Sequence, residues 1–206
     1  MKKNLSGKFI VLDGPDGCGK STQSKLLSEW IKAQGISVVS FRDPGTTHIG
    51  EKIRDILLDT AHEKMTINTE MLLYMAARAQ LWAEQIEPAL EKGDCVIMDR
   101  WISSTCAYQG YAGMLGVEKV LKVAQYSLER IWPDLTIILD VDTDTAEKRM
   151  DRQLDRMEQK GKDFHKKVRE GFLKLADLEQ KVTVIDAAKT IEEVHNLIIK
   201  AVKEIA

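Results

Sequence analysis

The chain has few of the features that mark secreted, membrane-spanning or nucleic-acid-binding proteins. Its 206 residues include three cysteines, Cys18, Cys95 and Cys106, which stand too far apart for a CxxC metal or redox pair. An odd number of cysteines also argues against a secreted disulfide framework, so we expect a cytoplasmic protein. The 30 lysine and arginine residues nearly balance the 32 aspartate and glutamate residues. This balance predicts no affinity for nucleic acid or for an anionic membrane.

Long apolar runs and linker-like segments are also missing. The N-terminal stretch MKKNLSGKFIVLDG reaches an aspartate after an apolar run too short for a signal-peptide core or a membrane span. The sequence contains no repeat, no low-complexity tract and no Pro/Ser-rich linker, and its length suits one α/β domain. We therefore expect residues 1–206 to form a single domain.

Short apolar segments alternate with segments of helical periodicity. The apolar segments are residues 8–13, 36–41, 94–99, 135–141 and 181–186, and the clearest helical segments are 21–35 and 69–92. This alternation predicts an α/β protein with a parallel sheet flanked by helices. Because none of the expected strands alternates polar with apolar residues, we expect each to be covered on both faces.

The stretch DGPDGCGKST, residues 13–22, joins the first expected strand to the first expected helix. Gly14, four further residues and then Gly19-Lys20-Ser21 form the pattern of a phosphate-binding loop, or P-loop. Such a loop aims backbone N–H groups and a helix dipole at one phosphate site. We expect ATP there, because no Asn-Lys-x-Asp segment is present to read guanine. The expected ATP-binding residues in the loop are Gly14, Pro15, Asp16, Gly17, Cys18, Gly19, Lys20, Ser21 and Thr22.

Three residues of this loop have further expected roles. Lys20 reaches the outer phosphates, and the hydroxyl of Ser21 suits Mg²⁺. Cys18 lies near a helix N-terminus, where the pKa of a thiol tends to fall. It is either a reactive thiol or a small side chain packed in the loop.

A second polar cluster is expected where two other strands end, at RDPGTTHIG (42–50) and DRWISSTCAYQGY (99–111). Open α/β sheets bind ligands at this edge. Asp99 would bind Mg²⁺ or its waters, or else cap the N-terminus of the next helix. The planar guanidinium of Arg100 can donate two hydrogen bonds to a phosphate. Tyr74 and Arg78 lie four apart on the expected helix 69–92 and share a face. They would stack a base and clamp its phosphate, unless Tyr74 belongs to the core and Arg78 to the solvated surface.

Arg149, Arg152 and Arg156 have the spacing of one stripe along a helix. A stripe that closes over two polyanions would stabilise a transferring phosphoryl group. The acidic residues interleaved with it fit an ordinary salt-bridged surface helix equally well. A hydroxyl acceptor would need a base to remove its proton, whereas a phosphate monoester is already nucleophilic. The candidate site residues are mainly cationic, so they favour a monophosphate acceptor.

Several stretches, taken in order, resemble the thymidylate kinase family: LDGPDGCGKST, FRDPGTT, AARAQL, DRWISSTCAYQG, PDLTIILDV, LDRME and VIDA. They run from residue 12 to residue 187. The resemblance implies a five-stranded parallel sheet flanked by helices, of the P-loop nucleoside monophosphate kinase type, and a homodimer. It also implies transfer of the γ-phosphoryl group of ATP to dTMP with Mg²⁺, and a mobile lid at about residues 147–162.

The resemblance also assigns residues to the two substrates. Those implied to bind dTMP are Asp43, Tyr74, Arg78, Arg100, Thr105, Tyr108 and Gln109. Asp43 would meet the sugar 3′-hydroxyl, Tyr74 would stack on thymine, and Tyr108 would crowd the 2′ position. Thr105 and Gln109 would lie near the base edge, whereas the two arginines would bind the acceptor phosphate. Those implied to border adenine are Arg149, Ala187 and Ala188.

The expected catalytic residues are Asp13, Lys20, Arg100, Arg152 and Arg156, and the expected metal-binding residues are Ser21 and Asp99. The arginines of RMDRQLDRME suggest the bacterial type, with a catalytic arginine in the lid.

Two positions depart from the family pattern: Thr46 replaces a glycine, and Trp101 could reshape the phosphate end of the acceptor site. The alternatives are a kinase for another nucleoside monophosphate or a deoxynucleoside, and an ATPase or nucleotide sensor without an acceptor.

Overall fold

A five-stranded parallel sheet forms the centre of the protein. The computed structural model describes residues 5–150, 153–179 and 181–206. Its strands are β1 (Phe9–Asp13), β2 (Val38–Arg42), β3 (Cys95–Asp99), β4 (Leu135–Asp140) and β5 (Val182–Asp186), in the spatial order β2-β3-β1-β4-β5. The predicted parallel sheet is therefore confirmed. Each strand lies at an expected position, with its ends shifted by at most two residues.

Helices connect the strands. They are α1 (Lys20–Ala33), α2 (His48–Leu58), α3 (Ile67–Leu81), α4 (Glu87–Glu91), α5 (Ile102–Thr105), α6 (Val117–Ser127), α7 (Thr143–Lys148), α8 (Lys162–Leu178) and α9 (Ile191–Glu204). A short 3₁₀ turn spans Thr60–His62, and π-helical segments extend α3 (Trp82–Ile86, η2) and α5 (Cys106–Ala112, η3). The expected helix 69–92 is thus α3, η2 and α4 in sequence. Within the described residues no helix is both long and apolar enough to cross a bilayer.

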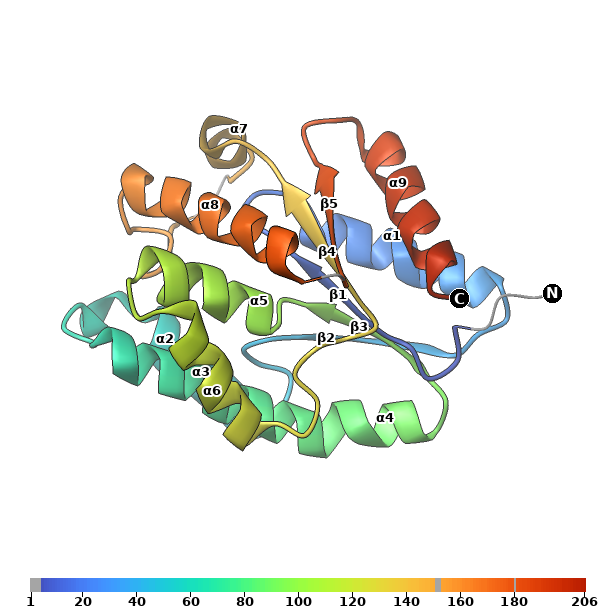
Figure 1. The fold of residues 1–206 in the computed structure, drawn as a ribbon, viewed down its shortest axis with the longest axis horizontal. Helices are drawn as coiled ribbons and strands as arrows, with labels where there is room; N and C mark the ends of the chain where they lie inside the picture. The colour runs from blue at the N-terminus through green and yellow to red at the C-terminus, as the bar shows by residue number, and fades with distance from the viewer. Residues whose placement is uncertain (1–4, 151–152, 180) are drawn as a thin grey trace.

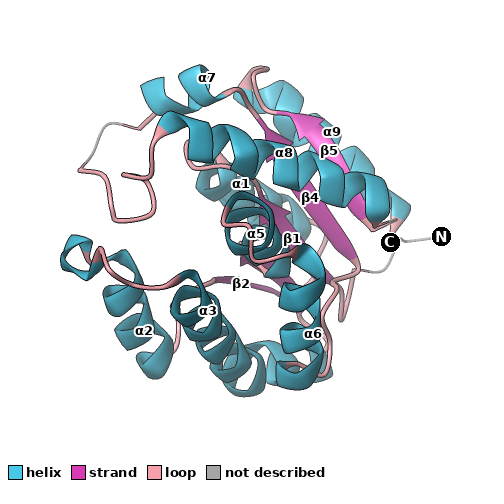
Figure 2. Ribbon diagram, turned by 60° about the vertical axis from the view of Figure 1, so that its left-hand side comes forward, coloured by secondary structure: helices cyan, strands magenta, loops and turns pink. Residues whose placement is uncertain are grey.

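The strand side chains alternate between two helical layers. Ile10 and Leu12 of β1 belong to a core cluster with residues of α1 and α9, which lie side by side on one face of the sheet (Figure 1). Phe9 and Val11 point to the other face and pack in a cluster with residues of α3 and α6. Figure 2 shows α3, α5, α6 and α8 together on this second face. Because successive residues of a strand face opposite ways, β1 serves both layers and all of it is buried.

The expectation that every strand is covered on both faces is wrong for the two outer strands. β2 and β5 are at the edges of the sheet, and most of their residues are half-buried or exposed. Val184 of β5, for example, keeps 40% of its surface exposed. An outer strand lacks a neighbour on one side, so its apolar residues alone do not show that it is covered.

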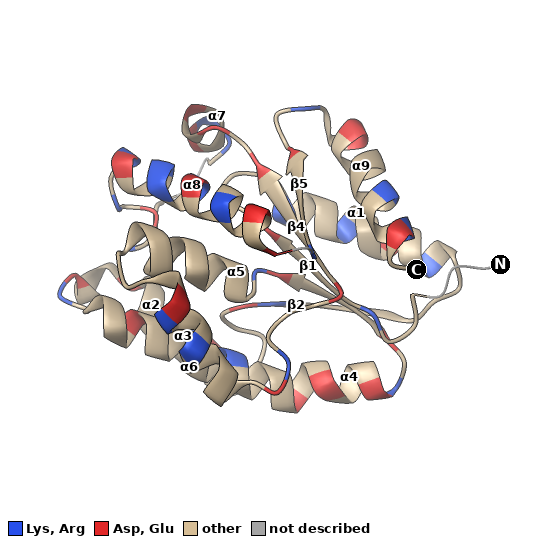
Figure 3. Ribbon diagram, viewed as in Figure 1, with Lys and Arg blue, Asp and Glu red and all other residues tan. Residues whose placement is uncertain are grey.

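Charges of both signs are spread over the helices. Along α8, acidic and basic positions alternate, as Figure 3 shows. Arg169 of this helix donates two hydrogen bonds to Asp140 at the end of β4, at 2.6 and 2.7 Å. Neither helical layer therefore carries charges of one sign only. Local groups of charged side chains, rather than the net charge, determine where an ion could bind.

Candidate active site

The P-loop connects β1 to α1 at the point where the chain leaves the centre of the sheet. Gly14 has a φ of 136°, and a Cβ added there would lie 2.5 Å from the carbonyl oxygen of Leu139. Gly17 has a φ of 76°, and a Cβ there would overlap the carbonyl oxygen of Ala146, just before α7 ends. These positive φ values and close backbone contacts favour glycine, so the loop pattern has a steric cause here.

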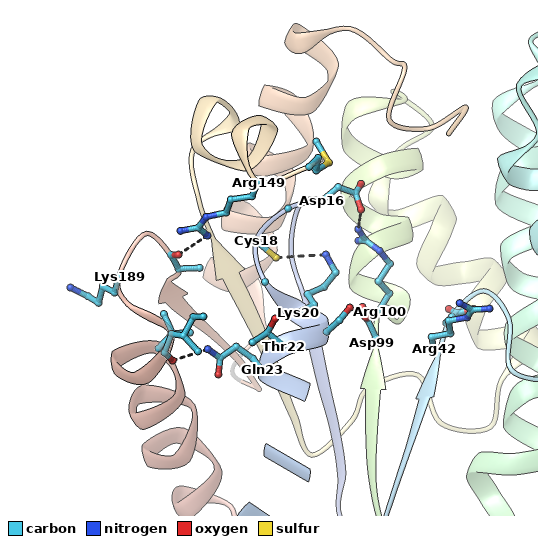
Figure 4. A pocket seen from close by; sticks show the side chains of 18 of the residues that line it. Asp16, Cys18, Lys20, Thr22, Gln23, Arg42, Asp99, Arg100, Arg149 and Lys189 are labelled. Carbon is cyan, nitrogen blue, oxygen red and sulfur yellow. Dashed lines mark hydrogen bonds and ion pairs between the residues drawn. The ribbon is translucent and has the colours of Figure 1, made fainter. Parts of the chain in front are cut away.

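The side chain of Lys20 curls back over the loop. Its Nζ donates to the carbonyl oxygens of Gly14 and Pro15, at 3.1 and 2.9 Å, and lies 3.6 Å from the Sγ of Cys18 (Figure 4). Cys18 is 2% exposed, and burial raises the pKa of its thiol despite the nearby Lys20 and Arg100. The expectation of a lowered thiol pKa is therefore wrong, because removal from water outweighs the local positive charge. The alternative, a small side chain packed in the loop, fits the structure.

A cavity of about 810 Å³ opens in front of the loop. The expected residues that line it are Asp16, Gly17, Cys18, Gly19, Lys20, Ser21, Thr22, Asp43, Asp99, Arg100, Arg149 and Ala187. Gly14 and Pro15 do not line it but hold Lys20 through their carbonyl oxygens. Arg149 donates to the carbonyl oxygen of Ala187 at 3.0 Å, which brings the end of α7 against the turn after β5 (Figure 4). Ala188 is exposed and lies next to this wall without lining the cavity.

Two oxygen donors meet at the opening of the loop. The hydroxyl of Ser21 donates to Oδ2 of Asp99 at 3.2 Å, although these residues belong to α1 and β3. Trp101 rather than Asp99 is the N-cap residue of α5, so the capping alternative does not apply. The described residues hold no cluster of three or more histidine, cysteine, aspartate or glutamate side chains of the kind that binds a metal ion. Mg²⁺ bound to a nucleotide needs only one or two protein oxygens, so the donor set of Ser21 and Asp99 fits it.

Asp13 organises the segment that follows β3. Its carboxylate is fully buried and accepts hydrogen bonds from the hydroxyls of Ser103 and Ser104, at 2.5 and 2.6 Å, and from the backbone N–H of Gly14 at 2.8 Å. Nη1 of Arg100 lies 3.4 Å from the same carboxylate. Asp13 was expected to be catalytic. In this geometry it positions Arg100 and does not line either cavity described here.

Arg100 lies between the P-loop and a second, smaller cavity. Nη1 donates to the carbonyl oxygen of Gly14 at 3.0 Å, and Nη2 forms a 2.5 Å ion pair with Asp16. The second oxygen of Asp16 accepts from the hydroxyl of Tyr108 at 2.8 Å. Burial alone would raise the pKa of Asp16, but Arg100, Lys20 and the Tyr108 hydroxyl together hold it well below its ordinary value. Asp16 is therefore ionised, and it accepts from the guanidinium N–H groups of Arg100 that could otherwise bind a phosphate.

The second cavity has a volume of about 90 Å³. All seven residues expected to bind dTMP line it: Asp43, Tyr74, Arg78, Arg100, Thr105, Tyr108 and Gln109. They come from the end of β2, from α3 and from the segment after β3 through α5 to η3. The structure therefore brings the whole expected acceptor set together. The volume is smaller than a ligand site usually requires, and Asp16 of the P-loop also lines this cavity.

Arg78 is buried, not a solvated surface charge. It is 1% exposed and forms a 2.5 Å ion pair with Asp43. Nη2 also donates to Oγ1 of Thr105 at 3.0 Å and to the carbonyl oxygen of Trp101 at 3.3 Å. Oδ1 of Asp43 is buried without a hydrogen-bond partner in the described structure. A buried carboxylate oxygen in this state is suited to accept from a ligand hydroxyl.

The two positions that depart from the family pattern, Trp101 and Thr46, are not among the residues that line this cavity. Trp101 is fully buried, donates from Nε1 to the carbonyl oxygen of Ile131 at 2.7 Å, and packs on Phe9. Its ring packs in the core and also lies against Arg78, whose guanidinium carbon is 5.3 Å from the ring centroid. An effect of Trp101 on the acceptor site, through Arg78, stays a prediction. Thr46 adopts a φ of 70°, and its hydroxyl lies 3.1 Å from the carbonyl oxygen of Arg42. This contact holds the turn that a glycine would form more easily.

The expected arginine helix does not form. Arg149 is the C-cap residue of α7, residues 153–155 are not helical, and Arg156 begins a turn. Arg156 forms a 2.7 Å ion pair with Glu70 and donates to the carbonyl oxygen of Leu57 at 2.7 Å. Arg149 and Arg156 therefore face different parts of the protein. Arg152 lies outside the described residues.

Two site residues were missed in the sequence. Arg54 of α2 lines both cavities and donates to the carbonyl oxygen of Pro44 at 3.0 Å. Glu70 of α3 is 1% exposed and contacts Gln109, Arg156 and Lys160. The spacing of Glu70, Tyr74 and Arg78, four residues apart each, would have placed Glu70 on the same helix face. Arg54 has no comparable signal in the sequence.

The comparisons with known proteins agree with this geometry. A family model described as thymidylate kinase matches residues 12–198. The thymidylate kinase of Caldanaerobacter subterraneus subsp. tengcongensis is 46% identical over 202 residues, which cover 97% of each chain. That of Geobacillus sp. (strain WCH70) is 38% identical over 205 residues, 97% of this chain and 98% of the relative.

A solved structure supports the same conclusion for the fold. The crystal structure of thymidylate kinase from Ehrlichia chaffeensis superposes with a TM-score of 0.79 at 30% identity, over 96% of this chain and 99% of that one. The expected fold, a P-loop nucleoside monophosphate kinase fold, is thereby confirmed. The match of the family model and the similarity of these relatives together show that the chain belongs to the thymidylate kinase family.

Proposed function

We propose that this protein transfers the γ-phosphoryl group of ATP to dTMP, giving dTDP and ADP. The observation that carries the proposal is the position of Arg100, which lines both the cavity of the P-loop and the smaller cavity of the acceptor residues. A guanidinium at this junction can contact the phosphates of both substrates. Membership of the thymidylate kinase family supports thymine as the base.

The chain's own residues supply positioning and charge. ATP enters the larger cavity, where the loop N–H groups and Lys20 hold its phosphates. The adenine ring lies by Arg149, Ala187 and Ala188. Ser21 and Asp99 would hold Mg²⁺, which when bound neutralises charge on the β- and γ-phosphates. The acceptor phosphate is already nucleophilic and needs no base, so the cationic groups around it are sufficient.

In the acceptor cavity, Asp43 meets the sugar 3′-hydroxyl through its unpartnered oxygen, and Tyr74 stacks on the base. Tyr108 crowds the 2′ position, and Thr105 and Gln109 lie at the base edge. Arg100 and Arg54 are placed for the acceptor phosphate. Arg78 was assigned to this phosphate from the resemblance; its guanidinium is already engaged by Asp43 and Thr105, so it acts on the acceptor through them.

The segment 147–162 is proposed as the lid of a single domain spanning the chain, with Arg152 and Arg156 as its candidate catalytic arginines.

A homodimer is proposed through the surface of α2, α3 and α6. Ile49, Leu72 and Tyr126 on these helices expose 51%, 54% and 93% of their surface, and such apolar groups are typical of an interface between subunits. The cytoplasm is the expected location, in accord with three free cysteines.

The proposal is tested by the acceptor dependence of ADP release from Mg·ATP. The panel contains dTMP, dUMP, UMP, dCMP, dGMP and thymidine, with a blank lacking acceptor. We expect rapid ADP release with dTMP and little in the blank. If another monophosphate were the best acceptor, the assignment of the base would be wrong. Equal release in the blank would favour the ATPase or sensor alternative and overturn the kinase proposal.

A further inference from the structure

A buried network of side chains connects α3 to the residues at the base edge, and one member of it, Glu70, has no role in the proposal above. Glu70 and Arg78 lie eight residues apart on one face of α3, on either side of Tyr74. Glu70 contacts Gln109, whereas Arg78 contacts Thr105. Gln109 and Thr105 are each 1% exposed and both line the acceptor cavity.

The chemistry of Glu70 determines which end of the Gln109 amide faces it. Oε2 of Glu70 pairs with Nη1 of Arg156 at 2.7 Å, and Nζ of Lys160 lies 3.2 Å from Oε1. Arg156 and Lys160 have only donor groups, so both oxygens of Glu70 act as hydrogen-bond acceptors. Gln109 must therefore direct its NH₂ group to Oε1 of Glu70, at 2.8 Å. The amide oxygen of Gln109 is then the group that faces the opposite direction.

The same reasoning applies to Thr105. Arg78 only donates, so Oγ1 of Thr105 must accept at this 3.0 Å contact. The hydroxyl keeps its proton to donate to another group. The cavity wall thus offers a donor at Thr105 and an acceptor at Gln109.

We propose that Glu70 is a positioning residue for base selection, because its contact with Gln109 fixes an acceptor beside the donor of Thr105. Thymine and uracil present a carbonyl oxygen, O4, next to the N3–H donor, which complements this wall. Cytosine presents the reverse, an amino donor beside the N3 acceptor. The inference rests on the proposed function and adds the reason for excluding a cytosine nucleotide.

The test is the ratio of kcat/KM for dTMP to that for dCMP in Glu70→Gln. Arg156 only donates, so it would hold the oxygen of the new amide and leave its NH₂ group facing Gln109. Gln109 would then turn its own oxygen toward residue 70. We expect the ratio to fall about ten-fold or more, with dUMP following dTMP because the two bases share this edge.

Two further variants separate positioning from a general structural effect. Lys160→Met removes one cation from Glu70 but keeps its bond to Gln109, so the ratio should stay as in the wild type. In a Gln109→Met background, Glu70→Gln should have no additional effect on the ratio. The double variant E70Q/K160M restores the net charge of the cluster and serves if Glu70→Gln alone does not fold.

An equal change in kcat/KM for dTMP, dUMP and dCMP would overturn the inference, since loss of stability or of lid contacts affects all three acceptors alike. A fall of the ratio in Lys160→Met as large as in Glu70→Gln would also overturn it. These outcomes differ from failure of the proposed function itself, which would appear as no dTDP formed by the wild-type protein.

Discussion

Asp16 shows how a single side chain links the two cavities. Its carboxylate contacts Arg100 and Tyr108, and its pKa lies well below the ordinary value of 3.8. A carboxyl group whose pKa is lowered by folding stabilises the protein above its unfolded pKa. That contribution is lost as the pH falls toward the folded pKa. An incoming acceptor phosphate would compete with the same carboxylate for Arg100.

We predict that Asp16→Asn lowers the free energy of unfolding at neutral pH. The unfolding free energy of the variant should also fall less steeply than that of the wild type as the pH decreases. The difference in unfolding free energy between wild type and variant should be largest at pH 7 and shrink progressively below about pH 4. Urea unfolding at pH 7, 4 and 3 measures it, and the subtraction removes the contribution of other carboxylates. A difference that stays constant from pH 7 to pH 3 would show that Asp16 is not ionised against Arg100.

Many of the functional side chains could be predicted from the sequence, but their partners could not. Gly14, Lys20 and Ser21 carry a pattern with a local steric and electrostatic cause, so the loop is readable from spacing alone. The pKa of Cys18 was wrongly predicted because burial, which depends on the surrounding fold, outweighs the local helix end. The helix spacing could place Glu70 on the face of Tyr74 and Arg78, but not its contact with Arg156, which joins segments distant in sequence. Arg54 contacts Pro44, ten residues away, and had no signal in the sequence.

The segment between α7 and α8 differs most from its sequence expectation. The arginine spacing predicted a continuous helix, but Asp155 accepts hydrogen bonds from the N–H groups of Met157 and Glu158, at 2.8 and 3.0 Å. Such a contact begins a new turn and competes with a helix passing through it. The N–H of Arg156 also donates to the carbonyl oxygen of Leu58 in α2, at 3.1 Å. Contacts with α2 and α3 therefore determine the local conformation.

In the conformation described, Arg156 is held by Glu70 and by the carbonyl oxygen of Leu57, so its replacement should lower stability whether or not Arg156 also takes part in catalysis. Arg156→Met removes a buried partner of Glu70, and we expect it to lower the free energy of unfolding by about 2 kcal/mol, less than a fully unpaired charge because Lys160 remains. The matched control is Arg149→Met, which should cost no more than about 1 kcal/mol but raise the KM for ATP. Chemical denaturation of both variants measures the difference. Equal losses would contradict the structural role of Arg156.

The contact between the P-loop and α7 gives a second prediction about elements. A methyl group at Gly17 would overlap the carbonyl oxygen of Ala146. At Gly35, with a φ of 77°, an added Cβ would have no atom of the described residues within 4 Å apart from its own chain neighbours. Gly35→Ala should therefore cost about 1 kcal/mol of unfolding free energy, from backbone strain alone. Gly17→Ala should cost more and weaken ATP binding. Urea titrations and ATP binding by calorimetry test this, and matching results for the two variants would exclude the overlap.

The overall arrangement of strands and helices could be predicted from the sequence more fully than the contacts of single residues. The alternation of strands and helices predicted the parallel sheet, and the carboxyl ends of its central strands bring the P-loop, Asp99 and Arg100 together. The exposure of β2 and β5 was not predictable, because strand composition does not reveal which strands lie at the edges. Strand order depends on contacts between distant segments.

The exposed apolar groups of α2, α3 and α6 lead to a prediction about assembly. Sedimentation equilibrium should give the mass of two chains for the wild type. Tyr126→Lys, at a site 93% exposed in one chain, should shift the equilibrium toward one chain because a charge would enter the interface. Leu178→Lys, at an exposed apolar residue at the end of α8, is the control and should leave the mass unchanged. A single-chain mass for the wild type would contradict the homodimer.

The fate of the γ-phosphoryl group tests the central proposal most directly. The protein is incubated with Mg²⁺, dTMP and ATP labelled at the γ-phosphorus, and the labelled products are separated. If the two cavities hold donor and acceptor on either side of Arg100, the label should appear in the β-phosphate of dTDP in equal amount to the ADP formed. Label released mainly as inorganic phosphate, with dTMP unchanged, would contradict the account.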